Sequence, residues 1–190
     1  TVNHRSNQVG NSMWWEPIPG YLNPNSSKIA ISDDGSTWPD TWPDKMEDSN
    51  DPGWTGSWNG YFGKNQFNAG QEIFYKVSDD RNYIVGHPYS PDTTDLSRKG
   101  AGIQVGVRVL EWKQILIEDV LFLLHEIKND GSYNYHRVAF GNWMASIVGG
   151  NSDGGDDIID FDLINDIAWS LDSDGIGGPA FGSDRVGVAA

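Results

Sequence analysis

The sequence contains no cysteine, so the chain forms no disulfide bond and has no thiol chemistry. It also lacks a long apolar run: the longest spans residues 120–124, far short of the ~20 residues that cross a bilayer as a helix. Basic residues are scarce, because 13 Lys and Arg oppose 27 Asp and Glu, for a formal net charge of −14. Such a polyanion repels phosphate backbones and anionic lipid surfaces. We therefore expect no nucleic-acid partner and no membrane insertion.

The first 70 residues have little hydrophobic periodicity and are rich in Asn, Ser, Gly and Pro. They are nevertheless too aromatic for ordinary disorder, which is poor in large apolar side chains. Six of the nine tryptophans lie in this segment, at positions 14, 15, 38, 42, 54 and 58. We predict that residues 1–70 form an irregular wrapping segment anchored by its tryptophans, with a short strand at 28–32.

Alternation with a period of two begins after residue 70 and predicts β-strands. The predicted strands cover 71–77, 102–112, 117–128, 133–148, 158–171 and 186–189. The third has apolar residues on both faces, which is typical of a central strand, although a helix over 116–127 is the alternative. Asn129-Asp130-Gly131 predicts a hairpin turn between the third and fourth strands. The predicted fold is all-β, an antiparallel β-sandwich or jelly roll over residues 71–190, continuing past the last residue as part of a longer chain.

Aspartates are concentrated between residues 151 and 174, in two Gly-rich loops and the predicted strand between them. Carboxylates on alternate residues of a strand repel one another unless a cation or solvent separates them. Calcium takes six to eight oxygen ligands, so this pattern predicts a Ca²⁺ site, with solvated acidic loops as the alternative. The candidate ligands are Asp153, Asp156, Asp157, Asp160, Asp162, Asp172 and Asp174.

The second of these loops starts with Asp172-Ser173-Asp174-Gly175, an opening found in many calcium loops. It is not an EF-hand, because glycine stands at the fourth position rather than the sixth and no glutamate closes the loop.

Aromatic residues between positions 38 and 61 are candidates for a carbohydrate platform, because flat aromatic rings stack on sugar rings. The alternative is that they anchor the segment by burying large apolar areas. The candidate carbohydrate-binding residues are Trp38, Trp42, Trp54, Trp58 and Tyr61.

We predict no catalytic residues. On the strand predicted at 117–128, Glu118 and Glu126 share a face but lie ~26 Å apart, too far for a glycosidase carboxylate pair. His4, His87, His125 and His136 have no metal-binding spacing, and no nucleophile-elbow or phosphate-loop motif occurs.

The order of the motifs resembles large secreted proteins of Bacteroidota-type bacteria that end in a type IX secretion sorting domain. The residues that carry this resemblance lie at 38–40, 42–45, 53–63, 71–75, 119–122, 127–129, 140–144 and 156–175. The resemblance implies export across the outer membrane and a location on the cell surface or outside the cell. It supplies no catalytic residues. One departure is that Ala145 and Ser146 stand where relatives often have an acidic residue.

Together these patterns predict a non-catalytic structural or adhesive module of a larger secreted surface protein, stabilised by Ca²⁺ and able to form a layer or filament. The expected partners are further copies of itself or other surface proteins, with polysaccharide as another candidate. The alternatives are a carbohydrate-binding module and part of a secreted glycoside hydrolase.

Overall fold

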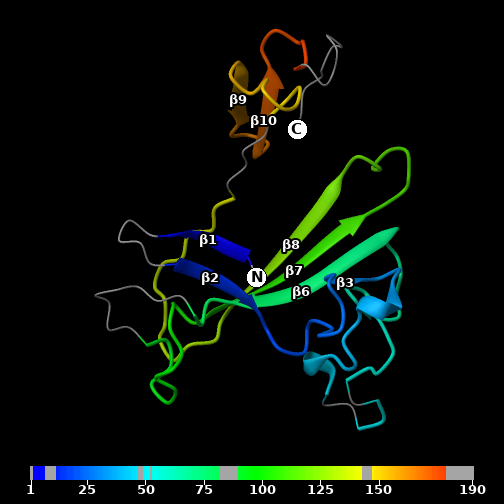
Figure 1. Ribbon diagram of the computed structural model, residues 1–190, viewed down its shortest axis with the longest axis vertical. Coiled ribbons are helices and arrows are strands. Elements are labelled where there is room, and N and C mark those ends of the chain that lie inside the picture. The colour runs from blue at the N-terminus through cyan, green and yellow to red at the C-terminus, as the bar shows by residue number, and fades with distance from the viewer. Residues whose placement is uncertain are drawn as a thin grey trace. The chain divides into compact units, whose positions relative to one another are not determined.

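The computed structural model describes residues 2–6, 12–46, 49–51, 53–81, 90–142 and 147–178 (Figure 1). These residues form β-strands, two single-turn 3₁₀-helices and connecting loops, and none of them belongs to an α-helix. All strand pairs are antiparallel, so the all-β prediction is confirmed, while the sandwich or jelly-roll arrangement stays a prediction. The chain divides into two compact units, residues 1–136 (unit 1) and 137–190 (unit 2).

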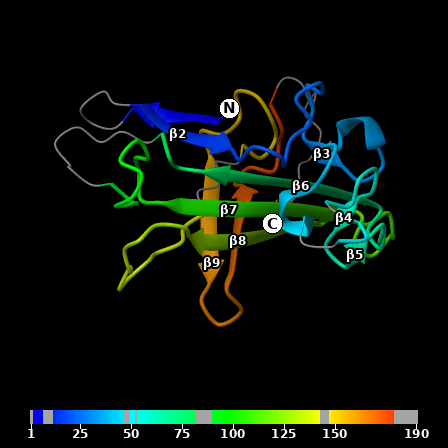
Figure 2. The same ribbon diagram turned by 90° about the horizontal axis from the view of Figure 1, so that it is seen from below.

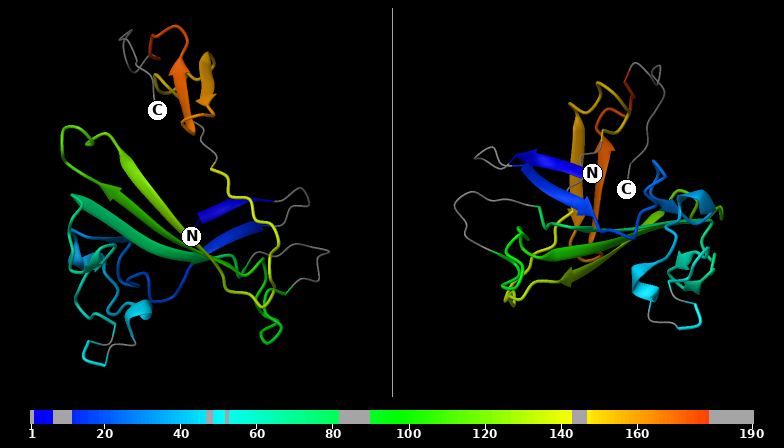
Figure 3. Two further views of the ribbon diagram at one scale, coloured as in Figure 1. Left: turned by 180° about the vertical axis from the view of Figure 1, so that it is seen from behind. Right: turned by 60° about the horizontal axis from the view of Figure 1, so that its bottom comes forward.

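Unit 1 is built on one antiparallel sheet of six strands, ordered β1-β2-β6-β7-β8, with β3 also paired to β6. The long strands β6, β7 and β8 run side by side in every view (Figures 1 to 3). A separate pair, β4 and β5, lies in the segment before β6. The elements are β1 (Val2–Ser6), β2 (Ser12–Pro17), β3 (Ala30–Ile31), η1 (Gly35–Thr37), η2 (Pro43–Lys45), β4 (Asn59–Gly60), β5 (Gly63–Lys64), β6 (Gln71–Ser78), β7 (Ile103–Glu111) and β8 (Leu121–Asn129).

Strands β6 and β7 confirm the predictions over 71–77 and 102–112. In β6 the buried residues Glu72, Phe74 and Ser78 lie on one face, as alternation requires, whereas β7 has buried residues on both faces. They pair along their full length, from Gln71 opposite Glu111 to Ser78 opposite Gln104. The short strand expected at 28–32 is present as β3, where Ala30 pairs with Phe74.

Tryptophan side chains from the first 70 residues form the core of unit 1 against β6. Trp42 and Trp58 are fully buried, with ring centroids 5.6 Å apart in an edge-to-face arrangement. The Trp42 ring also packs on Phe74 of β6 at 5.8 Å, and Tyr21 meets the same phenyl ring. Because the segment shares a hydrophobic core with Phe74 of β6, it belongs to the same compact unit as the sheet.

A buried ion pair within the sheet also receives hydrogen bonds from the tryptophan segment. Arg108 of β7 pairs with Glu72 of β6, and its guanidinium lies 3.6 Å from the centroid of the Phe74 ring. The Glu72 carboxylate also accepts hydrogen bonds from Trp58 Nε1 at 3.1 Å and from the Tyr61 backbone N–H at 2.9 Å. Both partners are therefore satisfied by several bonds, as buried charges require.

The strand predicted at 117–128 is central in the prediction but lies at the edge of the sheet in the structure. β8 begins at Leu121 and pairs with β7, and all its side chains except Leu124 are exposed. Apolar residues on both faces of this strand therefore did not mean that other elements cover both faces.

The hairpin predicted at 129–131 is wrong, and the described residues 131–142 form no return strand. The reason is that these polar residues bind a different loop. The Asp130 N–H donates to Gly102 O at 2.8 Å, the Ser132 N–H donates to Pro91 O at 2.7 Å, and Arg98 pairs with the Asp130 carboxylate at 3.2 Å. The hairpin of this region instead joins β7 to β8 through residues 112–120.

Unit 2 contains a hairpin of β9 (Asp157–Asp162) and β10 (Ile167–Asp172), where the sequence predicted one strand over 158–171. The Asp162 carboxylate makes the turn by accepting the N–H of Ile164 at 2.8 Å and the Asn165 side-chain amide at 2.6 Å. This local bonding competes with continued extension of the strand. The strand predicted at 186–189 lies outside the described residues. Among the described residues, no helix has the length and apolar character needed to cross a bilayer.

Candidate metal centre

The open end of the β9–β10 hairpin brings two aspartates face to face. Asp157, the first residue of β9, is paired directly opposite Asp172, the last residue of β10. Like charges directly opposite each other on an antiparallel pair are destabilising. The Gly-rich loop 149–156 leads into this end of the hairpin, and the loop 173–178 leaves it.

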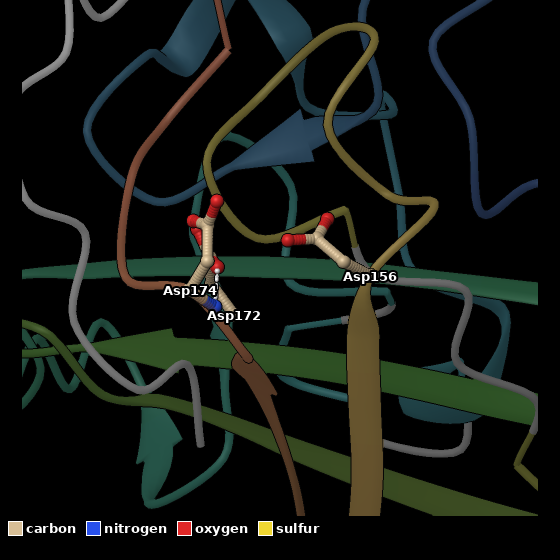
Figure 4. A group of neighbouring side chains, drawn as sticks. All are labelled: Asp156, Asp172 and Asp174. Carbon is tan, nitrogen blue, oxygen red and sulfur yellow. Dashed lines mark hydrogen bonds between the residues drawn. The ribbon is translucent and has the colours of Figure 1, made fainter.

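Three carboxylates from both sides of the hairpin end converge (Figure 4). One carboxylate oxygen from each of Asp156, Asp172 and Asp174 lies within 4.8 Å of the other two. Asp156 comes from the loop before β9, whereas Asp172 and Asp174 come from the end of β10 and the loop after it. Residues from both sides of the hairpin's open end thus contribute to one small volume.

Three buried carboxylate oxygens in this region have no hydrogen-bond partner among the described residues: Asp153 Oδ2, Asp157 Oδ1 and Asp172 Oδ2. The Asp172 residue is only 8% exposed. An unpaired carboxylate oxygen that is shielded from water is costly, and buried charges in proteins are normally paired or bound to metal. The orphaned oxygens therefore point to a ligand that the described residues do not supply.

The second oxygen of Asp157 and of Asp172 holds the backbone. Asp157 Oδ2 accepts the Val148 N–H at 3.1 Å, and Asp172 Oδ1 accepts the N–H groups of Asp174 at 3.0 Å and Gly175 at 2.9 Å. These bonds orient each carboxylate and leave its other oxygen available. Each side chain thus positions a loop and presents a ligand atom.

Gly149 makes room for the Asp153 carboxylate. Its φ is +81°, and a Cβ at this position would lie 1.8 Å from Asp153 Oδ2. The Gly149 carbonyl also accepts the Gly178 N–H at 2.9 Å, which ties the loop before β9 to the loop after β10. The sequence analysis included Asp153 as a ligand but missed the roles of Val148 and Gly149, because loop glycines and backbone groups give no distinctive sequence signal.

The electrostatics of the site favour a bound cation. Burial raises the pKa of the Asp153 carboxyl, and the nearby carboxylates of Asp172 and Asp156 raise it further. No Lys or Arg occurs between residues 138 and 178, whereas eight aspartates do. A hard divalent cation would offset this repulsion, and Ca²⁺ suits a cluster of carboxylates on flexible loops better than the smaller Mg²⁺.

Two of the predicted metal ligands lie away from this cluster. The Asp160 carboxylate is exposed on β9 and accepts the N–H of Phe161, while Asp162 makes the turn at the far end of the hairpin. Five residues of strand separate Asp157 from Asp162, a distance of ~16 Å. The structure therefore brings three of the seven predicted ligands together, Asp156, Asp172 and Asp174. Two more lie nearby: Asp157 is paired opposite Asp172, and Asp153 interacts electrostatically with the cluster.

The predicted carbohydrate-binding residues of unit 1 do not form one platform. Trp42 and Trp58 are fully buried, Trp38 and Trp54 are half-buried, and Tyr61 is 52% exposed. Burial of Trp42 and Trp58 leaves no face of either ring for a sugar. A surface hollow of about 360 Å³ does adjoin Trp38, and Asn23, Asp40 and Thr55 also line it.

No protein-family model, curated protein or solved structure matches this chain. The functional conclusion consequently depends on the geometry of the site, and the resemblance to secreted surface proteins stays a prediction.

Proposed function

We propose that this chain is a non-catalytic structural or adhesive module of an extracellular surface protein, stabilised by Ca²⁺ bound in unit 2. The observation that carries the proposal is the convergence of Asp156, Asp172 and Asp174 beside three buried, unpartnered carboxylate oxygens.

A structural role for the cation is supported by its place in the fold. Its ligands come from both sides of the open end of one hairpin, and the Asp172 carboxylate also holds the following loop through two backbone bonds. A cation in this position would connect two segments of residues 138–178, a stretch that contains no Lys or Arg of its own.

An extracellular location is consistent with such a site. Calcium sites of extracellular modules have dissociation constants of about 10⁻⁴ to 10⁻³ M, so modest affinity is enough where calcium is abundant. Export is also what the resemblance to secreted surface proteins implies. Protease treatment of intact source cells tests it: cleavage of the chain without lysis supports export, and full protection contradicts it.

Self-association is supported by the edge strand β8. Leu121 is 60% exposed, Leu123 56% and Ile127 43%, and long apolar edge strands are prone to pair with another chain. Sedimentation and electron microscopy of the purified chain test this part. A monomer at all concentrations, with and without calcium, would contradict assembly into a layer or filament.

Isothermal titration of chelator-treated protein with CaCl₂ tests the metal part of the proposal. We expect saturable binding that is weakened at least tenfold by Asp172→Asn and by Asp174→Asn. Asp160→Asn is the matched control, because it removes one charge from the same hairpin outside the cluster. Equal binding by wild type and both cluster variants, or no binding by wild type, would contradict the site.

Carbohydrate binding is the second candidate function, and the hollow beside Trp38 is the observation that favours it. Here one half-buried indole lies among the polar side chains of Asn23, Asp40 and Thr55, a combination suited to one sugar ring. Titration with a glycan panel, read by tryptophan fluorescence in wild type and Trp38→Ala, tests it. No response in wild type to any glycan would reject this function.

A further inference from the structure

We propose that unit 2 is a calcium-dependent folding switch, in which the β9–β10 hairpin is formed when the cation is bound and unfolded when it is removed. This inference rests on the proposed calcium site and adds a regulatory consequence to it: unit 1 stays folded in either state.

The first reason is that the hairpin has little apolar burial of its own. Ile159 is 70% exposed, Phe161 60% and Ile167 51%, and among the described residues of unit 2 only Val148 is a buried apolar side chain. An isolated two-stranded hairpin is marginally stable at best in water. The described contacts therefore leave the hairpin without the core that would hold it together.

The second reason is uncompensated charge at the end where the hairpin opens. Asp157 faces Asp172 across the strands, and Asp156 and Asp174 lie beside them. Asp172 is 8% exposed, and its Oδ2 has no partner among the described residues. With no Lys or Arg between residues 138 and 178, no basic side chain from this described stretch can neutralise the cluster. Metal-free folding would bring these charges together without compensation.

The third reason is the position of the ligands along the chain. The far end of the hairpin is already closed by the bonds that Asp162 makes with Ile164 and Asn165. At the open end, the candidate ligands belong to segments 153–157 and 172–174, which flank the two strands. A cation there closes the hairpin at its second end. Since the unfolded chain has no preformed site, the free energy of binding contributes directly to folding.

Unit 1 contains the features that unit 2 lacks. Trp42, Trp58 and Phe74 form a buried core on a sheet of six strands, and the pair Arg108 and Glu72 is satisfied internally. Its stability is expected not to depend on calcium, so it serves as an internal reference in the same molecule.

Hydrogen–deuterium exchange of the complete chain, in excess CaCl₂ and in excess EGTA, tests the switch. We expect amides of β9 and β10 to exchange at least tenfold faster in EGTA, while amides of β6 and β7 keep their protection. Calcium titration of the same sample reports binding independently. Binding without any change in β9–β10 exchange would overturn the switch and leave the calcium site in place, whereas no binding would overturn both.

The variant Asp172→Asn separates a metal role from a purely structural one. Asn retains a side-chain oxygen for the N–H groups of Asp174 and Gly175, but removes the charge that faces Asp157. In calcium its hairpin should exchange at least tenfold faster than that of wild type, and isothermal titration should show calcium binding weakened at least tenfold. Faster exchange in calcium together with wild-type calcium affinity would show that Asp172 is structural and overturn its assigned role, as would wild-type exchange in calcium. Asp160→Asn is the control and should keep the wild-type response to calcium.

Discussion

Asp157 and Asp172 lie opposite each other as the last residue pair of the β9–β10 ladder, and each has one buried carboxylate oxygen without a partner. The other carboxylate oxygen of each residue accepts hydrogen bonds from backbone N–H groups of the adjoining loops. Two like charges held in register by the backbone are unfavourable without a counter-ion.

Calcium should stabilise unit 2 against unfolding more than magnesium does. At a free calcium concentration of 100 times the dissociation constant, the expected gain in unfolding free energy is about 2.7 kcal/mol. Magnesium dehydrates reluctantly and requires a tighter octahedral site, so it should give a smaller gain at the same concentration. Urea unfolding, followed by exchange of β9–β10 amides, measures both. Equal stabilisation by the two ions would speak against a calcium site.

Replacing Gly149 with alanine should weaken calcium binding by about 10- to 100-fold, the range typical when groups that orient metal ligands are altered. The added Cβ would displace the Asp153 carboxylate, and a φ of +81° is itself unfavourable for alanine. Gly155→Ala in the same loop is the matched control, because a Cβ there would meet nothing within 4 Å. Isothermal titration measures the calcium affinity of both variants. An equal loss of affinity in the two would contradict the assigned role of Gly149.

Replacing Arg108 with methionine should lower the unfolding free energy of unit 1 by about 3–5 kcal/mol, because the buried Glu72 carboxylate loses its counter-charge. Glu72 still accepts bonds from Trp58 and Tyr61, but no other cation pairs with it among the described residues. The control Lys128→Met removes an exposed ion pair with Asp130 and should cost less than about 1 kcal/mol. Urea denaturation of both variants measures the difference.

Trp42→Ala should destabilise unit 1 by about 3–5 kcal/mol, since it leaves a large cavity between Trp58 and Phe74 and removes the bond from Trp42 Nε1 to Ser57 O. Phe62→Ala removes an aromatic ring that is 53% exposed and should cost much less. Similar unfolding free energies for the two variants would show that the tryptophan core does not stabilise unit 1.

The contribution of Asp79 to stability should fall as pH rises. Burial raises the pKa of this carboxyl above its usual value of 3.8, although it accepts the N–H groups of Ala101 and Ile103. A raised pKa in the folded state means that the protonated form is favoured by folding. The associated stability is present below the usual pKa and is lost as pH rises through the raised value.

The variant Asp79→Asn tests this sign, because its side chain stays neutral throughout. At fixed calcium concentration, the unfolding free energy of wild type minus that of Asp79→Asn should decrease between pH 4 and pH 7. A difference that increases over this range would mean that folding favours the charged carboxylate.

Much of the fold followed from local pattern. Alternation in β6 and β7 is a property of neighbouring residues, and their strands lie close to where it predicts them. The site was partly predictable for the same reason: the three carboxylates that converge, Asp156, Asp172 and Asp174, all belong to the acidic segments that the sequence analysis singled out.

The predictions that were wrong, the hairpin at 129–131 and the central position of β8, concern segments whose contacts are with residues distant in sequence. Asn129-Asp130-Gly131 has the composition of a hairpin turn, yet Asp130 bonds to Gly102 and Arg98 instead. The apolar residues of β8 cannot by themselves distinguish a central strand from an exposed edge, because coverage depends on which strands lie beside it.

The sequence by itself determined that the chain is acidic, free of cysteine and rich in β-structure, since net charge depends only on composition and alternation only on neighbouring residues. Tertiary structure decided which tryptophans are buried and which aspartates meet. Trp42 and Trp58 enter the core because β6 lies against them, and Asp172 reaches Asp156 because a turn at Asp162 folds β10 back along β9. Such contacts depend on the path of the whole chain, and no short stretch of sequence specifies them.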